Sequence, residues 1–237
     1  FGPDEKPPRK YYVDNVPVYV IAERVQYYGK DGKLITESLK DSVRNSSAIH
    51  TSAFALSQAP TRETVLALIK IAYDEGKLIS LDPNYHPHIW PDCPNFTSIL
   101  KETFQYVKVT KPSLDDCVRL FGPGHTEKEY ADYFLELGPE IVALTLGKDG
   151  VLLATAEGSY YKIHPSPISV VDVTGAGDAF WSGLLTALLT ENSPLESAQL
   201  GQAVAEFKIG VVGPVVSYPN LKALWEKAKR TKTTQPK

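Results

Sequence analysis

The chain has 237 residues, 43% hydrophobic and 22% charged, with a formal net charge of −3 at pH 7. This length and composition can bury one sizeable core, so we expect one main domain. The slight acidic excess argues against a nucleic-acid partner, and no apolar run is long enough to span a membrane. Two cysteines in unrelated segments and a charged, proline-rich start without a secretion signal predict a reducing, cytoplasmic location.

The first 36 residues carry weak signals. Residues 1–17 hold four prolines and mixed charges, and we assign them no structure. Residues 18–28 are rich in β-branched and aromatic side chains, and Gly29-Lys-Asp-Gly32 is a turn signal, so a hairpin or edge strand is predicted. The chain starts at Phe1 and has no methionine, where ordinary composition gives about five. We therefore expect it to be part of a longer gene product.

The next stretch alternates between helix and strand. A short polar helix is predicted at 38–46, a buried strand at 48–52, a helix at 61–75 and a strand at 78–81. A strand, a helix and a strand at this spacing form a βαβ unit, which implies a parallel sheet with helices on its faces. Ligands of such sheets bind beyond the carboxyl ends of the strands.

Two polar segments follow predicted strands. Asp82-Pro-Asn-Tyr-His86 comes directly after the strand at 78–81 and, taken alone, is a turn that ends that strand. A further strand is predicted at 106–110, and a helix ending at 121–122 then opens with Ser113 as N-cap and Asp116 as its third-turn acid.

The second half contains further helices and strands. An amphipathic helix at 127–137 places Tyr130 and Phe134 in the core, and a strand at 141–145 continues through a Lys-Asp-Gly turn into 151–154, as in a β-hairpin. Beyond these, we predict strands at 160–164 and 170–171, helices at 194–210 and 221–229, and a disordered tail at 231–237.

A glycine turn leads into a buried helix at Asp172-Val-Thr-Gly-Ala-Gly-Asp-Ala-Phe180. The first N–H groups of a helix have no carbonyl partner within it, and with the peptide dipoles they form an anion site. Gly175 and Gly177 allow a ligand to approach the backbone closely because neither has a Cβ. Taken alone, Asp178 is either an N-cap residue or a carboxylate placed at this anion site.

This stretch resembles the C-terminal signature of the ribokinase-like (PfkB) carbohydrate kinases. A chance match of six or more specified positions is on the order of one in 10⁵. The resemblance extends over roughly residues 45–230 and implies an α/β fold, a three-layer αβα sandwich with a mainly parallel central sheet and a small β lid. The family's N-terminal region, with a Gly-Gly motif that holds the sugar, is not found. No Walker A pattern occurs, so the phosphate site is expected at 175–178.

The resemblance assigns roles within the glycine turn. It implies that the amides of Gly175, Ala176 and Gly177 form an anion hole for the transferring phosphoryl group. Asp178 takes the position of the base that accepts the proton of the sugar hydroxyl. Asp172 and Thr174 take positions that help to bind a monovalent cation, K⁺, which shapes the anion hole.

It also implies a site for ATP with Mg²⁺. Ile141-Val-Ala-Leu-Thr-Leu-Gly-Lys-Asp-Gly150 is similar to the family's T-L-G-x-x-G segment, so Thr145, Gly147 and Gly150 are expected to contact the nucleotide. The family's adenine pocket frequently contains an asparagine, and Gln202 is the substitute that this chain offers.

The sugar and the metal-bound water are expected near Asp82, Asn84 and Asp116, because these segments resemble the family's D-x-N-x-R and K-x-N-x-x-E. The chain departs from both patterns. It has His86 for arginine, Ser113 for asparagine and Asp116 for glutamate. Histidine is mostly neutral at pH 7 and does not grip phosphate as arginine does, which weakens the case for a phosphate contact there.

We expect an ATP-dependent kinase of a sugar or sugar acid, similar to fructokinases and 2-keto-3-deoxygluconate kinases. A nucleoside kinase of the same fold and a non-catalytic sugar- or nucleotide-binding regulator are the alternatives. The kinase domain is expected at 37–230. Residues 1–36 are either a lid remnant, with Arg24 at the sugar and a homodimer formed through the lid, or an ordinary edge hairpin.

Overall fold

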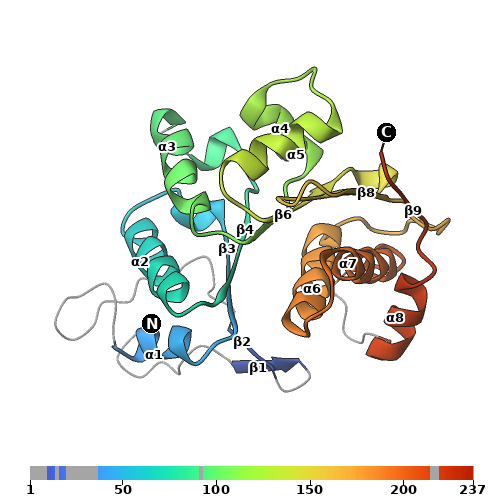
Figure 1. The fold of residues 1–237 in the computed structure, drawn as a ribbon, viewed down its shortest axis with the longest axis horizontal. Coiled ribbons are helices and arrows are strands. Elements are labelled where there is room, and N and C mark those ends of the chain that lie inside the picture. The colour runs from blue at the N-terminus through green and yellow to red at the C-terminus, as the bar shows by residue number, and fades with distance from the viewer. Residues whose placement is uncertain (1–9, 14–15, 20–36, 91–92, 214–218, 237) are drawn as a thin grey trace. The chain divides into compact units, whose positions relative to one another are not determined.

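The computed structural model describes residues 10–13, 16–19, 37–90, 93–213 and 219–236 (Figure 1). It divides into two compact units, the first of Phe1–Pro123 with Glu136–Glu140 and the second of Gly124–Leu135 with Ile141–Lys237. Both units combine helices with β-strands, so the α/β class is confirmed. Within the described part of the chain, no helix is both long enough and apolar enough to cross a membrane.

The first unit is built around three parallel strands. β3 pairs with β4 in the register Ile49 to Ile79, and β4 pairs with β5 in the register Leu81 to Thr110. A separate antiparallel hairpin precedes them. The strands are β1 (Lys10–Val13), β2 (Val16–Tyr19), β3 (Ala48–Ser52), β4 (Leu78–Asp82) and β5 (Val109–Thr110); the helices are α1 (Glu37–Arg44), α2 (Thr61–Asp74), α3 (Cys93–Phe104) and α4 (Leu114–Phe121), with 3-10 turns η1 (Ala53–Leu56) and η2 (Pro87–Ile89).

The predicted βαβ unit is confirmed. Helix α2 packs against β3 and β4 and buries Val65, Leu68, Ile69 and Ala72, the apolar stripe that the sequence shows at helical spacing. Helix α3 was not predicted, although Phe96, Leu100 and Phe104 recur at intervals of four and are all buried. The proline near its start, Pro94, obscures that signal.

The N-terminal hairpin differs from the prediction. The strand expected at 18–28 and the turn at 29–32 lie largely outside the described residues. The observed hairpin, β1 with β2, lies earlier, where the prolines discouraged any assignment. The tyrosines and valines of these two strands favour extended backbone.

The second unit has a sheet of four antiparallel strands between helices. Helix α5 lies on one side of this sheet and α6 to α8 on the other (Figure 1). The pairing order is β6, β7, β8 and β9. The elements are α5 (Glu127–Glu136), β6 (Ile141–Thr145), the 3-10 turn η3 (Gly147–Asp149), β7 (Val151–Thr155), β8 (Tyr160–Ile163), α6 (Ala176–Leu189), α7 (Pro194–Ile209), α8 (Leu221–Ala228) and β9 (Thr233–Thr234).

Most of these elements lie where the sequence predicts them, and Tyr130 and Phe134 are core residues as expected. The strand expected at 170–171 is absent from the described residues. There the N–H of Val171 donates to the carbonyl of Ile209 at the end of α7, 2.8 Å away, instead of to a neighbouring strand. Thr233–Thr234, in the segment expected to be a disordered tail, pair with β8.

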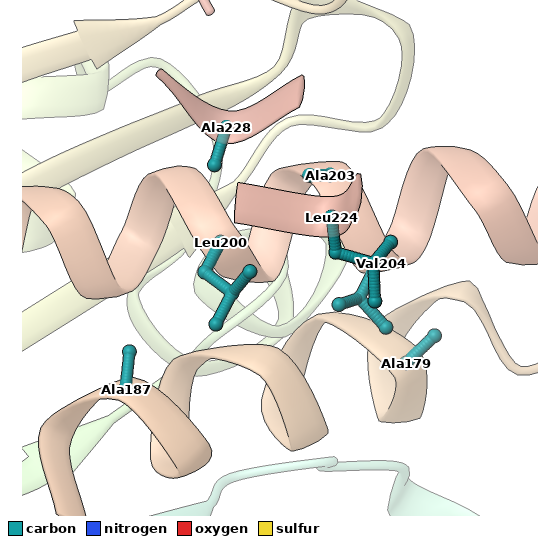
Figure 2. Close-up of a cluster of buried hydrophobic side chains, with 7 residues drawn as sticks. All are labelled: Ala179, Ala187, Leu200, Ala203, Val204, Leu224 and Ala228. Atoms are coloured by element: carbon teal, nitrogen blue, oxygen red, sulfur yellow. The ribbon is translucent and has the colours of Figure 1, made fainter. Parts of the chain in front are cut away.

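Helices α6 and α7 approach each other at two glycines. A Cβ on Gly183 would lie 2.8 Å from the Cα of Gly201, and a Cβ on Gly201 would lie 2.9 Å from the carbonyl oxygen of Phe180. Both distances are shorter than real Cβ contacts, so neither position accepts a larger residue without a backbone shift. Small and branched apolar side chains line the same interface and extend it to α8 (Figure 2): Ala179, Ala187, Leu200, Ala203, Val204, Leu224 and Ala228.

Replacing Gly183 with valine should force the two helices apart. We expect Gly183→Val to lower the free energy of unfolding by about 2 kcal/mol or more, measured by urea denaturation, because overpacking costs roughly 1–3 kcal/mol and can cost more. Ser182→Val, at the exposed neighbouring position, introduces the same side chain into the same helix and should cost less than about 1 kcal/mol. Equal losses for the two variants would contradict the close contact.

Candidate active site

The glycine turn ends at Gly175, the N-cap of α6, in the left-handed conformation with φ 76°. The N–H of Ala176 donates to Val173 at 3.1 Å, and that of Ala179 donates to Gly175 at 2.9 Å. The N–H groups of Gly177 and Asp178 have no acceptor among the described residues. The start of α6 therefore presents two free donors, as an anion site requires.

Asp178 lies in the first turn of α6 and is exposed, with no hydrogen bond or ion pair from its side chain within the described part of the protein. It is not the N-cap, because Gly175 occupies that position and provides no side-chain cap. The capping interpretation of Asp178 is therefore wrong. A solvent-accessible carboxylate next to two free N–H groups can accept a proton from a group bound at the same place.

Asp172 holds the turn in place. Its Oδ1 accepts from the N–H of Thr174 at 2.9 Å, and its Oδ2 accepts from the N–H of Gly213 at 3.1 Å. The Nζ of Lys208 lies 3.6 Å from the same Oδ2. The pKa of Asp172 falls from 3.8 to about 2, mainly because Thr174 donates hydrogen bonds to it. The hydrogen bond from Gly213 and the charge of Lys208 lower it further. Lys208 is a site residue that the sequence interpretation missed.

The segment expected at the nucleotide is a tight turn between β6 and β7, so the predicted hairpin is confirmed. The N–H of Leu146 donates to Gly150 at 2.8 Å, and Gly147 and Gly150 both have positive φ, 58° and 85°. A Cβ on Gly150 would lie 2.1 Å from the carbonyl oxygen of Ile163, so only glycine fits there. Thr145, at the end of β6, is half-buried, and Gly147 is exposed.

Gln202 is buried in a polar network on α7. Its Nε2 donates to Oε1 of Glu206 at 3.0 Å, and the N–H of Ser166 donates to the same oxygen at 2.7 Å. Lys227 of α8 lies 2.8 Å from the other oxygen. Burial raises the pKa of Glu206, but the bonds from Lys227, Ser166 and Gln202 outweigh it and leave the pKa below its ordinary value. The amide of Gln202 therefore belongs to a network around Glu206 that joins α7 to Ser166 and to α8.

In the first unit, Asp82 and Asp116 organise the loop after β4. Asp116 is buried; its Oδ1 accepts from the N–H of Tyr85 at 2.8 Å, and its Oδ2 accepts from the N–H and the hydroxyl of Ser113, at 2.9 and 2.5 Å. The N-cap predicted at Ser113 is confirmed. Asp116 lies in the first turn rather than the third, because its side chain reaches back to Ser113 and completes a capping box. Asp82 forms a buried ion pair with Lys111, whose Nζ is 3.3 Å from its Oδ2.

Asn84 belongs to the same loop. It is exposed, has a positive φ of 32°, and donates its N–H to Oδ1 of Asp82 at 3.2 Å. The structure thus brings Asp82, Asn84 and Asp116 together through one loop, and it adds Lys111, which follows β5 directly. Arg24 lies outside the described residues. Asp172, Thr174 and Asp178 belong to the second unit with Thr145, Gly147 and Gly150.

The low pKa of Asp172 predicts a pH dependence of stability. A carboxyl group whose pKa is lowered on folding stabilises the protein above its unfolded value, near pH 4, and this contribution is lost as the pH falls toward 2. We expect carboxyl NMR to give a midpoint near 2 for Asp172. Thermal unfolding of Asp172→Asn should depend less on pH between about 4 and 2 than that of the parent. An ordinary midpoint for Asp172 would contradict the hydrogen-bonded geometry.

Known proteins resemble this chain in sequence and fold. The model of the pfkB family carbohydrate kinases matches residues 25–221. An ATP-dependent 6-phosphofructokinase of Thermoanaerobacterium thermosaccharolyticum is 37% identical over 78% of this chain and 57% of its own length. A fructokinase of Salmonella thompson is 31% identical over 64% of this chain and 68% of its own length.

Among solved structures, aminoimidazole riboside kinase from Salmonella enterica, complexed with aminoimidazole riboside and an ATP analogue, superposes with a TM-score of 0.69. It is 26% identical, with 77% of this chain and 62% of that chain covered. The chain spans just over half the length of the first curated relatives that it matches. The resemblance seen at the glycine turn is confirmed over most of the sequence, and the chain belongs to the pfkB family of carbohydrate kinases.

Proposed function

We propose that this protein transfers the γ-phosphoryl group of ATP to a hydroxyl group of a sugar or sugar acid. The observation that supports this most directly is the pair of N–H donors at Gly177 and Asp178, next to the carboxylate of Asp178, all without a partner among the described residues. Phosphoryl transfer needs donors for the equatorial oxygens and an acceptor for the proton of the attacking hydroxyl. One turn of α6 provides both.

In this mechanism the phosphoryl group lies against the start of α6, where the N–H groups and the helix dipole stabilise its negative charge. The carboxylate of Asp178 orients the sugar hydroxyl and accepts its proton as the oxygen attacks phosphorus in line with the leaving ADP. Asp172 keeps the turn in the required conformation through Thr174 and Gly213. Gly175 and Ala176 complete the turn.

The nucleotide is proposed to lie along the β6–β7 turn, with Thr145 and Gly147 in contact and Gly150 holding the turn. We propose no nucleotide contact for Gln202, because it is buried and its amide already serves Glu206. Mg²⁺ would neutralise charge on the triphosphate. We propose that phosphate oxygens and water hold most of the coordination of this ion, and that Asp82 belongs to its water network.

The sugar is proposed to lie near Asp82 and Asn84. Asp116 is better suited to positioning this loop than to holding metal-bound water, since its two oxygens already accept three hydrogen bonds. We also propose that Arg24 contacts the sugar and that residues 1–36 form a lid through which two copies of the chain dimerise. Relatives are named 6-phosphofructokinase, fructokinase, 5-dehydro-2-deoxygluconokinase and aminoimidazole riboside kinase, and these names differ in the substrate.

Two alternatives remain open. A nucleoside kinase would use the same turn and the same base on a ribose hydroxyl. A non-catalytic binding protein is favoured by His86, which stands where the family pattern has arginine and stacks on His88 with ring centres 5.0 Å apart. A monovalent cation is also implied at Asp172, but the ammonium of Lys208 already lies beside that carboxylate.

Asp178→Asn should abolish turnover and preserve nucleotide binding. We expect kcat to fall by roughly 10³-fold or more in an ADP-release assay with fructose, 2-keto-3-deoxygluconate, fructose 6-phosphate, ribose and adenosine, because the proton acceptor is lost. Asp74→Asn, an exposed aspartate on α2, is the matched control and should behave as the parent. Activity of Asp178→Asn equal to the parent's would refute the mechanism, and ATP binding without turnover of any acceptor would favour the regulator.

A further inference from the structure

A buried lysine lies directly behind the glycine turn. Lys208, in the last turn of α7, is only 5% exposed. Its Nζ lies 3.5 Å from the carbonyl oxygen of Asp172, 3.5 Å from that of Val211 and 3.6 Å from Oδ2 of Asp172. Its Cε lies 3.7 Å from the place where a Cβ on Gly175 would be. The ammonium group therefore sits among three oxygens from two loops.

These oxygens belong to the segments that enter α6 and leave α7. The same two segments are joined by hydrogen bonds from the N–H of Val171 to Ile209 at 2.8 Å and from the N–H of Gly213 to Asp172 at 3.1 Å. An ammonium group buried without oxygen partners would be strongly destabilising. The three oxygens offset the cost of burying the Lys208 ammonium only while Asp172 and the two carbonyls remain in place. The burial of this charge and the conformation of the turn therefore depend on each other.

We propose that Lys208 is a positioning residue whose ammonium serves as an internal cation, holding the 172–175 turn so that the N–H groups of Gly177 and Asp178 face the phosphoryl group. A carboxylate and two carbonyl oxygens are also the ligands that a bound monovalent cation such as K⁺ would use. Two positive charges do not share such a buried place, because their repulsion is large at low dielectric. The protein therefore works without K⁺.

The kinetic part of this inference rests on the proposed function. The test compares the full-length parent protein, Lys208→Met and Lys222→Met, an exposed lysine on α8, in K⁺ or in tetramethylammonium at equal ionic strength. Methionine retains most of the volume and removes the charge. Two quantities are measured for each protein: kcat for ADP release with its acceptor, and the midpoint of thermal unfolding, which requires no activity.

The parent and Lys222→Met should have the same kcat in both salts and a midpoint that K⁺ does not raise. Lys208→Met should lose roughly 10- to 100-fold in kcat in tetramethylammonium, because the donors are misplaced. K⁺ should restore part of this loss and raise the midpoint of this variant alone, since it binds the vacated place.

Three results would overturn the inference: a parent that needs K⁺ for activity or is stabilised by it, a Lys208→Met protein as active as the parent without K⁺, or a loss of activity that K⁺ does not restore. If no acceptor is turned over by any of the proteins, the proposed function fails. The thermal midpoints then still decide the role of Lys208. If Lys208→Met does not fold, the response of the parent to K⁺ decides it.

Discussion

The close contact of α6 and α7 at Gly183 and Gly201 is the constraint on which the site depends. Because neither glycine has a side chain, the two helices approach at backbone distance, and a Cβ on Gly183 would lie 2.8 Å from the Cα of Gly201. The helices run in opposite directions, so this contact brings the start of α6 to the end of α7. The glycine turn and Lys208 meet for that reason.

That meeting explains how a glycine-rich turn can be both open and well defined. Gly175 allows the left-handed conformation that leaves N–H groups free, but glycine also lowers the cost of leaving that conformation. Asp172 limits this freedom by accepting hydrogen bonds from Thr174 and Gly213, and the ammonium of Lys208 neutralises the carboxylate of Asp172. The charges within the site are thus arranged in order: an ammonium, a carboxylate, a row of donors and the proposed place of a phosphoryl group. In such preorganised sites the donors stabilise the developing charge without first reorganising.

Local patterns predicted the parts of this arrangement that depend on local sequence. The sequence predicts the stripe of α2, the β6–β7 hairpin, the N-cap at Ser113 and the glycine turn, each of which extends over about fifteen residues or fewer. Lys111 with Asp82, and Lys208 with Asp172, join residues far apart in the chain, and nothing in their local sequence indicates a partner. Gln202 shows a second limit of local sequence. Its amide side chain suits a nucleotide contact, but on α7 it is buried and donates to Glu206 instead.

We propose that the N–H groups of Gly177 and Asp178, at the start of α6, receive the phosphoryl group. Backbone ¹⁵N NMR of the full-length protein, with ADP, Mg²⁺ and aluminium fluoride as a mimic of that group, tests it most directly. We expect Gly177 and Asp178 to show the largest amide shifts on adding fluoroaluminate to the ADP complex, together with slower hydrogen exchange. Unchanged amides at these two residues, in a protein that binds the mimic elsewhere, would contradict it.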